Sequence, residues 1–265
     1  MDDQIAHSNR DRGVATNYND AGTMIMEMIY GQNYLSPDGA GVSARLAALA
    51  QIRAQDVVLD IGCGLGGAAC YLARTLGCSV QGMDLMATNV MEAQRRARQQ
   101  EGLTGVGFHC ADALAVPFSA ESFDVVWGQD AWCHIEDKVG LIKQVKRVLR
   151  ADGRLVFRDW LLSDPQCQDH EAIREVTASP GIGDADLYRR VLAEQGFDVL
   201  HDSGPNESVI EAYRVALSRL RTMREDISAR FSERVYRVVL EKQSFVLGAF
   251  ESGQLRVGSF LAKKC

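Results

Sequence analysis

The chain of 265 residues has no long apolar run and no pattern typical of a secretion signal. A membrane-spanning helix needs about 18 or more consecutive apolar residues, and no such segment is present. The first residues, MDDQIAHSNRDRG, are polar and lack the apolar stretch of a signal peptide. We therefore expect a cytoplasmic protein without a membrane partner.

The sequence also lacks a basic stripe. Acidic residues outnumber basic ones by 35 to 29, and the formal net charge is −6. Proteins that bind nucleic acid usually present clustered Lys and Arg to the phosphates. The one basic cluster, Arg95, Arg96 and Arg98, lies on a helical pattern next to Glu101, and we interpret it as a solvated helix face. The charge thus argues against a nucleic-acid substrate.

No CxxC pair, no GxSxG motif and no histidines at metal-ligand spacing are found in the sequence. The seven cysteines are odd in number and scattered in spacing. This favours reduced, mostly buried thiols over a disulfide framework or a zinc site. We expect no bound metal and no nucleophilic serine chemistry.

Apolar runs typical of buried strands alternate with amphipathic helical patterns along the middle of the chain. Such an alternation predicts an α/β fold built on a doubly wound parallel sheet. We expect strands at 57–62, 79–84, 106–112, 123–128 and 154–160, with helices at 66–76, 86–102 and 137–150.

Helical segments are added to this core near both ends of the chain. The N-terminal part contains TMIMEMIYG, which is apolar enough to need burial. Two more strands are expected at 197–204 and 254–264, with long helical patterns between them. We predict an N-terminal helical lid at 1–40, a core at 41–203 and 250–265, and a helical cap at 204–249, inserted before the last strand.

The segment VLDIGCGLGG (58–67) connects the first strand of the alternating region to its helix through four glycines. Glycines at such a turn let the backbone approach a ligand closely. A dinucleotide-binding fold uses the same device for a pyrophosphate. The glycines alone therefore leave open an NAD-dependent dehydrogenase or another nucleoside-binding protein.

Three aspartates at the ends of three strands distinguish between these alternatives. Asp60, just before the first glycine of the loop, is better placed for an amino group than for a pyrophosphate. Asp84 occupies the position that binds ribose hydroxyls in doubly wound folds, and Asp112 ends the next strand. Ribose hydroxyls, an adenine amine and an ammonium occur together in S-adenosylmethionine, which has no phosphate. The competing interpretation is that these aspartates only cap helices.

The motifs VLDIGCGLGG, GMDL, CADALAVPF and FDVVWGQDAWCHI resemble those of the class I S-adenosylmethionine-dependent methyltransferases, over about residues 55–160. The resemblance implies a Rossmann-like fold with seven strands, mostly parallel, and an antiparallel last strand. The closing QLRVGSFLAKK fits such a strand, which a dehydrogenase lacks. The resemblance also implies S-adenosylmethionine as the cofactor.

Further stretches are similar to the phosphoethanolamine N-methyltransferases and the sarcosine/dimethylglycine methyltransferases: residues 18–39, WGQDAWCHIEDK, and SPGIGDADLYRRVLAEQGF. The N/D-P-P-Y/F motif of nucleic-acid amino-methyltransferases is replaced by GQDAW. The resemblance implies N-methylation of a small amine or amino-acid-like acceptor by a monomer or homodimer. The alternative is a C- or O-methyltransferase of a secondary-metabolite or isoprenoid acceptor.

The glycine loop, the strand-end aspartates and the resemblance together predict the cofactor contacts. The methionine end would meet the lid and the glycine loop, the ribose the second strand, and the adenine the third. The predicted cofactor-binding residues are Leu35, Ser36, Asp60, Gly62, Gly64, Gly66, Asp84, Leu85, Asp112, Ala113 and Gln129.

Methyl transfer from a sulfonium requires donor and acceptor to be aligned about 3 Å apart. An amine acceptor must also be neutral, and His134 is expected to take or relay its proton. By resemblance, Tyr18 closes over the substrate and Asp130 lies near the methyl group. Aromatic faces that stabilise a methylated cation are expected from Trp132, Trp160 and Tyr188.

Overall fold

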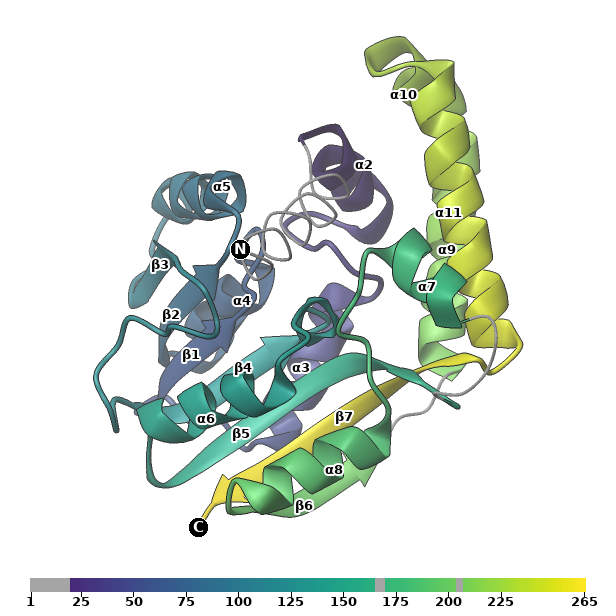
Figure 1. The fold of residues 1–265 in the computed structure, drawn as a ribbon. Helices are drawn as coiled ribbons and strands as arrows, with labels where there is room; N and C mark the ends of the chain where they lie inside the picture. The colour runs from purple at the N-terminus through teal and green to yellow at the C-terminus, as the bar shows by residue number, and fades with distance from the viewer. Residues whose placement is uncertain (1–19, 165–169, 204–206) are drawn as a thin grey trace, which may run out of the picture.

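The computed structural model describes residues 20–164, 170–203 and 207–265 (Figure 1). Its centre is one sheet with the strand order β3-β2-β1-β4-β5-β7-β6. The strands are β1 (Val57–Ile61), β2 (Ser79–Asp84), β3 (Val106–Cys110), β4 (Phe123–Gln129), β5 (Leu149–Leu162), β6 (Phe197–Ser203) and β7 (Leu255–Lys264). The pairs among β1 to β5 are parallel, whereas β7 runs antiparallel to β5 and β6. The seven-stranded, doubly wound fold expected from the sequence is confirmed.

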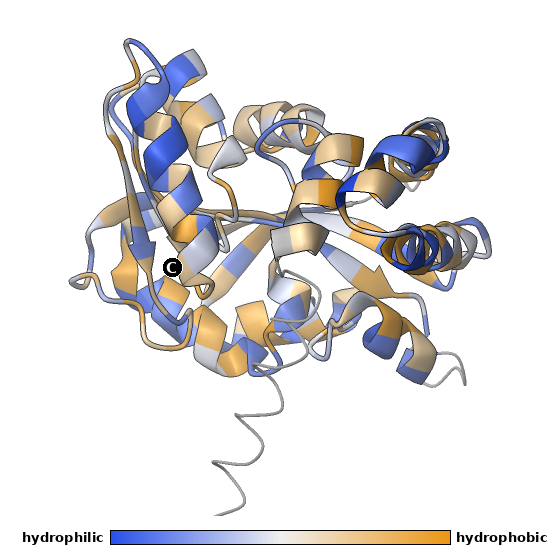
Figure 2. Ribbon diagram, turned by 90° about the horizontal axis from the view of Figure 1, so that it is seen from above, coloured by the Kyte–Doolittle hydropathy of each residue, from blue (hydrophilic) through white to orange (hydrophobic). Residues whose placement is uncertain are grey.

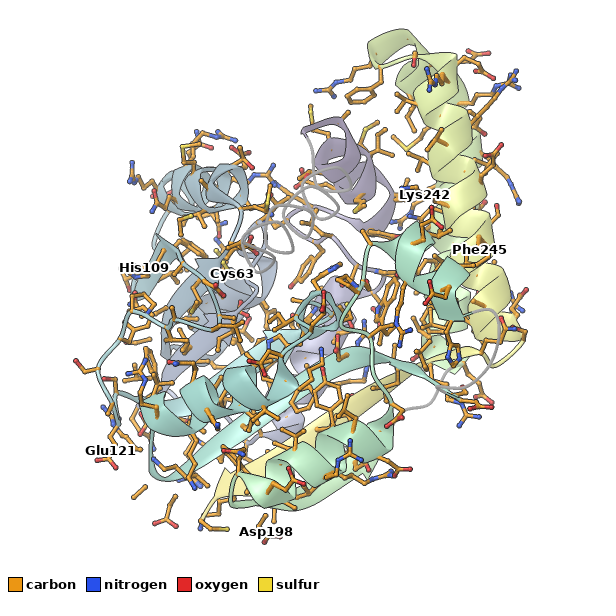
Figure 3. The ribbon with its side chains drawn as sticks, viewed as in Figure 1. Cys63, His109, Glu121, Asp198, Lys242 and Phe245 are labelled. Atoms are coloured by element: carbon orange, nitrogen blue, oxygen red, sulfur yellow. The ribbon has the colours of Figure 1, made fainter. Side chains whose placement is uncertain are left out.

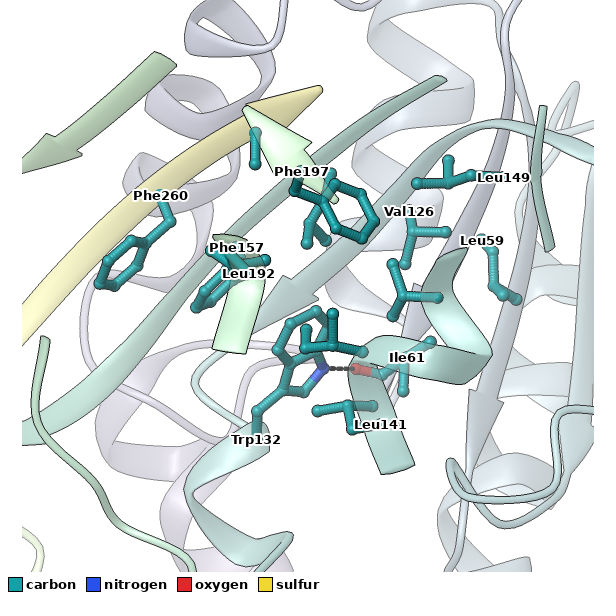
Figure 4. Packing of buried hydrophobic residues seen from close by; sticks show 14 of the residues in the cluster. Leu59, Ile61, Val126, Trp132, Leu141, Leu149, Phe157, Leu192, Phe197 and Phe260 are labelled. Carbon is teal, nitrogen blue, oxygen red and sulfur yellow. Dashed lines mark hydrogen bonds between the residues drawn. The ribbon is translucent and has the colours of Figure 1, made fainter. Parts of the chain in front are cut away.

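Helices cover both faces of this sheet, so its strands are apolar along most of their length. One face packs against α6 (Lys138–Val148) and α8 (Ala185–Glu194), with Trp132 and Phe157 in the shared core (Figure 4). The other face packs against α3 (Gly39–Leu49), α4 (Gly67–Leu76) and α5 (Ala87–Gln99). In Figure 2 the helices around the sheet carry both hydrophilic and hydrophobic residues, as expected for helices that bury one side.

A helical arm lies between β6 and β7 in the chain, where the sequence predicted an insertion. It consists of α9 (Glu207–Thr222), α10 (Arg224–Arg230) and α11 (Glu233–Glu251), and it extends away from the sheet in Figure 1. Next to it lie α2 (Asp20–Tyr30), which packs on α9, and α7 (His170–Thr177), which packs on α11. No helix among the described residues is long and apolar enough to cross a membrane.

Two predicted boundaries were wrong. The first of the long helical patterns expected between the last two strands, at 208–231, is broken at Met223 into α9 and α10. The strand expected from 154 begins at Leu149 instead, with Asp152 in a left-handed conformation (φ 60°) within it. Helix α7 was not expected, because its eight residues are too few to show a clear helical period.

Candidate active site

The first cavity lies at the carboxyl ends of β1, β2 and β4, where ligands bind in open α/β sheets. It encloses about 1110 Å³ of empty space, part of it open to solvent. Segment 33–36, which precedes α3, covers one side of it. The predicted cofactor residues in its lining are Leu35, Ser36, Asp60, Gly62, Gly64, Asp84, Leu85, Asp112, Ala113 and Gln129.

The glycine loop brings the backbone close to this cavity. Gly62 and Gly64 have φ values of 85° and 52°, a region that side chains rarely adopt. A Cβ added to Gly64 would have Leu35 as its nearest neighbour, at 3.4 Å. Gly66 does not line the cavity; a Cβ there would lie 2.6 Å from the Phe108 ring. The prediction of cofactor contact by Gly66 was wrong, because this glycine permits close packing of helix on sheet.

The three strand-end aspartates differ in their hydrogen-bond partners within the protein. Asp84 accepts hydrogen bonds from the backbone N–H of Gly64 and of Met86, both at 2.9 Å. Asp112 accepts from Leu114 N at 2.8 Å and is exposed. Asp60 is 1% exposed, and its Oδ2 atom has no hydrogen-bond partner among the described residues. Burial, aided by the charge of Asp84, raises the pKa of Asp60 to about 8.

A second cavity of about 600 Å³ adjoins the first, and four residues line both: Leu35, Ser36, Asp130 and His134. Its other walls come from α2, β5, α7, α9 and α11, so it lies between the sheet and the helical arm; Figure 3 labels Lys242 on α11. The additional lining residues are Met26, Tyr30, Cys133, Trp160, Val176, Thr177, Ser179, Tyr213, Lys242, Gln243 and Val246.

His134 ends the short 3-10 turn η1 (Trp132–His134), at the boundary between the two cavities. Its Nδ1 lies 2.9 Å from the carbonyl oxygen of Ala178. Since a carbonyl only accepts, Nδ1 carries the hydrogen, and Nε2 is the basic atom of the neutral ring. Burial lowers the pKa of His134, and the positive charge of Lys138 lowers it further.

Asp130 and Arg158 form a buried ion pair between the cavities, with side chains that are 1% and 5% exposed. The guanidinium contacts both carboxylate oxygens, with a distance of 2.7 Å from Nε to Oδ1. The backbone N–H of Asp130 also donates to the carbonyl of Arg158, at 2.8 Å. The pair leaves no net charge at this place, so the carboxylate of Asp130, expected near the methyl group, is already engaged by Arg158.

Gln129 ends β4 and joins it to the beginning of α3. Its Nε2 donates to the carbonyl of Gly39, and its Oε1 accepts from the hydroxyl of Ser43, both at 2.9 Å. Both ends of this amide are therefore engaged by α3. Gln129 fixes the wall of the first cavity.

Two of the three aromatic residues predicted to bind substrate belong to the core instead. Trp132 is 1% exposed; its ring stacks on Phe157 with centroids 4.6 Å apart, and its N–H donates to Ile61 O (Figure 4). Tyr188 is fully buried, and its hydroxyl donates to Asp159 at 2.6 Å. Trp132 also lines the first cavity, but neither ring lines the second one, and Lys138 Nζ lies over the Tyr188 ring, 5.5 Å from its centroid. The structure thus does not bring these two rings to the second cavity as predicted.

Trp160 does line the second cavity, with Tyr213 and Phe250 at its edges. Its indole N–H has no partner among the described residues. Tyr18, the predicted residue that closes over the substrate, lies outside the described residues. Sequence reasoning missed Tyr30 and Gln243, which are hydrogen-bonded to each other across the second cavity. Gln243 interrupts the apolar face of α11, and this was a signal for a polar site.

Helix α2 is fastened to the core by an ion pair. Arg96 on α5 contacts both carboxylate oxygens of Glu27 on α2, and it donates to Asn33 Oδ1 at 2.8 Å. The side chains of Arg96 and Glu27 are 18% and 19% exposed. The sequence suggested that Arg96 belongs to a solvated helix face. In the structure it instead holds segment 33–36 over the first cavity.

A family model described as a methyltransferase domain matches residues 59–157. Phosphoethanolamine N-methyltransferase 1 of Zea mays is 26% identical over 93% of this chain and 49% of its own length. The chain thus spans about half the length of that relative. The 27-O-demethylrifamycin SV methyltransferase of Amycolatopsis mediterranei is 32% identical over 74% of each chain.

Among solved structures, phosphoethanolamine N-methyltransferase 2 of Haemonchus contortus in complex with S-adenosyl-L-methionine is similar, with a TM-score of 0.87 and 24% identity. The similarity covers 96% of this chain and 59% of that one, and it shows a shared fold. The matched methyltransferase domain includes the glycine loop and the strand ends around the first cavity. By fold and by sequence, the chain belongs to the class I S-adenosylmethionine-dependent methyltransferases.

Proposed function

We propose that the chain transfers methyl groups from S-adenosylmethionine to the nitrogen of a small amine or amino-acid-like acceptor. The observation that carries this proposal is the position of His134 between two adjoining cavities. The first has the strand-end aspartates of a nucleoside site, and the second is enclosed by helices. N-methyltransferases among the relatives support the nitrogen acceptor.

The first cavity suits the cofactor because its polar groups match the ligand. Asp60 has a buried oxygen without a partner, and an ammonium group would supply both a donor and a compensating charge. Asp84 would hold the ribose, and Asp112 with Ala113 the adenine. When bound, the cofactor supplies a methyl group attached to a sulfonium sulfur. This sulfur leaves as a neutral thioether, so its departure needs no acid.

His134 would take the proton from the acceptor. An ammonium has no lone pair, so the amine must lose its proton before it attacks. The lowered pKa keeps the ring neutral at pH 7, with Nε2 as its basic atom. Trp160, Tyr30 and Tyr213 would stabilise the cation that forms as methyl groups accumulate.

We further propose that residues 1–40 act as a lid and 204–249 as a cap over the core at 41–203 and 250–265. Both helical parts contribute walls to the second cavity, through Met26 and Tyr30 of α2 and Gln243 and Val246 of α11. An acceptor enclosed in this way would be shielded from water.

Thermal unfolding tests the cofactor assignment directly. S-adenosylhomocysteine at about 100 times its Kd should stabilise the protein by about 2.7 kcal/mol, a rise of a few degrees in Tm. NAD should give no rise. Labelled S-adenosylmethionine, offered with glycine derivatives, ethanolamines and natural-product acceptors, then identifies the acceptor atom. Stabilisation by NAD alone would contradict the cofactor assignment.

One observation favours a second candidate, an O- or C-methyltransferase of a natural product. The relative with 32% identity is named for a demethylated rifamycin, and the second cavity has apolar walls at Met26, Val176 and Val246. Methylation of natural-product hydroxyls or carbons, without activity on any amine, would select this alternative.

The ion pair between Glu27 and Arg96 gives a prediction for the lid. Glu27→Gln should raise the Kd for S-adenosylhomocysteine about 3- to 10-fold, because segment 33–36 is held less firmly over the first cavity. Isothermal titration measures the change. Glu92→Gln is the matched control, since Glu92 also pairs with Arg96 but lies on α5 itself. Equal Kd changes in both variants would show that the contact with α2 is immaterial.

A further inference from the structure

Two charged residues without an assigned part in the reaction are buried beside the turn that carries His134. Lys138, at the start of α6, is 3% exposed, and Asp159 of β5 is fully buried. Burial lowers the pKa of Lys138 and raises that of Asp159. Buried charged groups often contribute less to stability than apolar side chains of the same volume would. Stability alone is therefore a weak explanation for both of them.

Their hydrogen bonds hold the backbone of the turn η1 (Trp132–His134). Asp159 accepts from the N–H of Cys133 at 3.0 Å, and its other oxygen accepts from the hydroxyl of Tyr188. The ammonium of Lys138 donates to the carbonyl of Trp132 at 2.5 Å and to that of Ile135 at 2.6 Å. One residue binds an N–H of the turn, and the other binds the carbonyls on either side of His134.

The turn has little hydrogen bonding of its own. His134 N donates to Ala131 O at 3.3 Å and Ile135 N to Trp132 O at 2.9 Å, as in a short 3-10 helix with weak geometry. The ring of His134 nevertheless has a defined direction, because Nδ1 donates to the carbonyl oxygen of Ala178 in the segment after α7. A small rotation of the turn would break that contact.

We propose that Lys138 and Asp159 are positioning residues: they fix the turn η1 from both sides and so set the direction in which His134 faces the acceptor. Tyr188, which was expected at the substrate, orients Asp159 and belongs to the same assembly. The proposal rests on the proposed function only in taking His134 as the proton acceptor.

Lys138 has a second effect, through its charge. Charged groups near His134 are Lys138 from α6, Glu136 beside the turn, Asp159 and the pair Asp130–Arg158 from β4 and β5, and Lys242 on the wall of the second cavity. Among these groups, Lys138 is the one whose positive charge lowers the pKa of His134 and so opposes protonation of the ring. Lys138 thus both holds the turn and favours the neutral form of the His134 ring, which can accept a proton.

Two substitutions separate the hydrogen bonds from the charge. Lys138→Met removes both, whereas Lys138→Gln keeps an amide N–H that can donate to one carbonyl. Lys138→Met should lower kcat at least 10-fold, with KM for the acceptor and Kd for S-adenosylhomocysteine changed less than about 3-fold. Lys138→Gln should retain more of kcat. In both, the His134 ring should titrate at a higher pH than in the unaltered protein.

Arg147 provides the matched control. It also lies on α6 and donates to two backbone carbonyls, those of Val116 and Phe118, far from His134. Arg147→Met should lower Tm to a similar extent and leave kcat and the His134 titration unchanged. If Lys138→Met lowers kcat no more than Arg147→Met does at equal loss of Tm, Lys138 is structural only and the proposal is wrong.

The His134 titration, followed by NMR in the complex with S-adenosylhomocysteine, needs no methyl acceptor. It therefore tests the positioning even if no amine in the panel is methylated. If Lys138→Met does not fold, Tyr188→Phe is the second variant, since it frees one oxygen of Asp159 and leaves the ring in place. Its His134 Nδ1–H should exchange faster with solvent. Unchanged exchange and unchanged titration in every folded variant would overturn the proposal.

Discussion

Replacing His134 with alanine should lower kcat by about 10²- to 10⁴-fold, the usual contribution of a positioned general base. The increase in Tm on binding S-adenosylhomocysteine should be retained, because the aspartates that would hold the cofactor are unchanged. The acid limb of kcat/KM should lie below pH 6.5 in the unaltered protein, since burial lowers the pKa of His134 from that value. In the variant this limb should disappear.

His109 serves as the control for this variant. It is also partly buried, with one ring nitrogen hydrogen-bonded to Gln81, but it lines neither cavity. His109→Ala should leave kcat within about 3-fold of the unaltered enzyme. A fall in kcat of less than 3-fold for His134→Ala would show that the ring only shapes the pocket.

Replacing Asp60 with asparagine should weaken cofactor binding and stabilise the ligand-free protein. The side chain is isosteric, but it lacks the charge that would pair with the cofactor's ammonium. We expect the Kd for S-adenosylhomocysteine to rise about 10- to 100-fold, since a hydrogen bond to a charged group contributes about 1.5–3 kcal/mol. Isothermal titration at pH 7.5 measures this change.

The stabilisation follows from the raised pKa of Asp60, about 8 compared with an ordinary value of 3.8. Between these pH values the folded protein keeps a proton that the unfolded chain has released, so the free energy of unfolding falls as the pH rises. Asp60→Asn removes this dependence. Its Tm should exceed that of the unaltered protein at pH 8, and the difference should shrink towards pH 4.

Replacing Asp56 with asparagine should change Tm in the opposite direction, so this variant serves as a control. It is buried as well, but Arg154 donates to its carboxylate at 2.6 Å. Asp56→Asn should therefore lower Tm at pH 8, because the partly buried guanidinium of Arg154 loses its only acidic partner among the described residues. If both asparagine variants change Tm in the same direction, the missing hydrogen-bond partner of Asp60 is not the cause of the Tm change in Asp60→Asn.

The sheet and the first cavity were predictable from the sequence because both depend on local patterns. Each buried strand is a short apolar run, and each of the three aspartates lies in the last two residues of a strand or within two residues after it. The carboxyl ends of parallel strands meet at one edge, so neighbours in the sheet are also neighbours at the site. This is why the sequence alone already indicated that Asp60, Asp84 and Asp112 lie together, as they do in the lining of the first cavity.

The second cavity was not predictable in this way. Its walls combine Tyr30, Trp160, Tyr213 and Gln243, which come from distant segments, and only tertiary packing decides which helix faces meet. The aromatic residues illustrate the difficulty. Trp132 and Tyr188 have polar tips that are satisfied within the core, and their sequence surroundings do not distinguish them from a residue that faces a ligand.

The strand order has a consequence for how the chain folds during synthesis. β7 lies between β5 and β6, so β6 leaves the ribosome well before the strand that ties it to the sheet. The helices α9 to α11 are made in the interval, and α9 and α11 pack against each other. The second cavity has walls from both β5 and this arm. We therefore expect it to close only after residues 255–264 have been added, so a growing chain should complete the first cavity before the second.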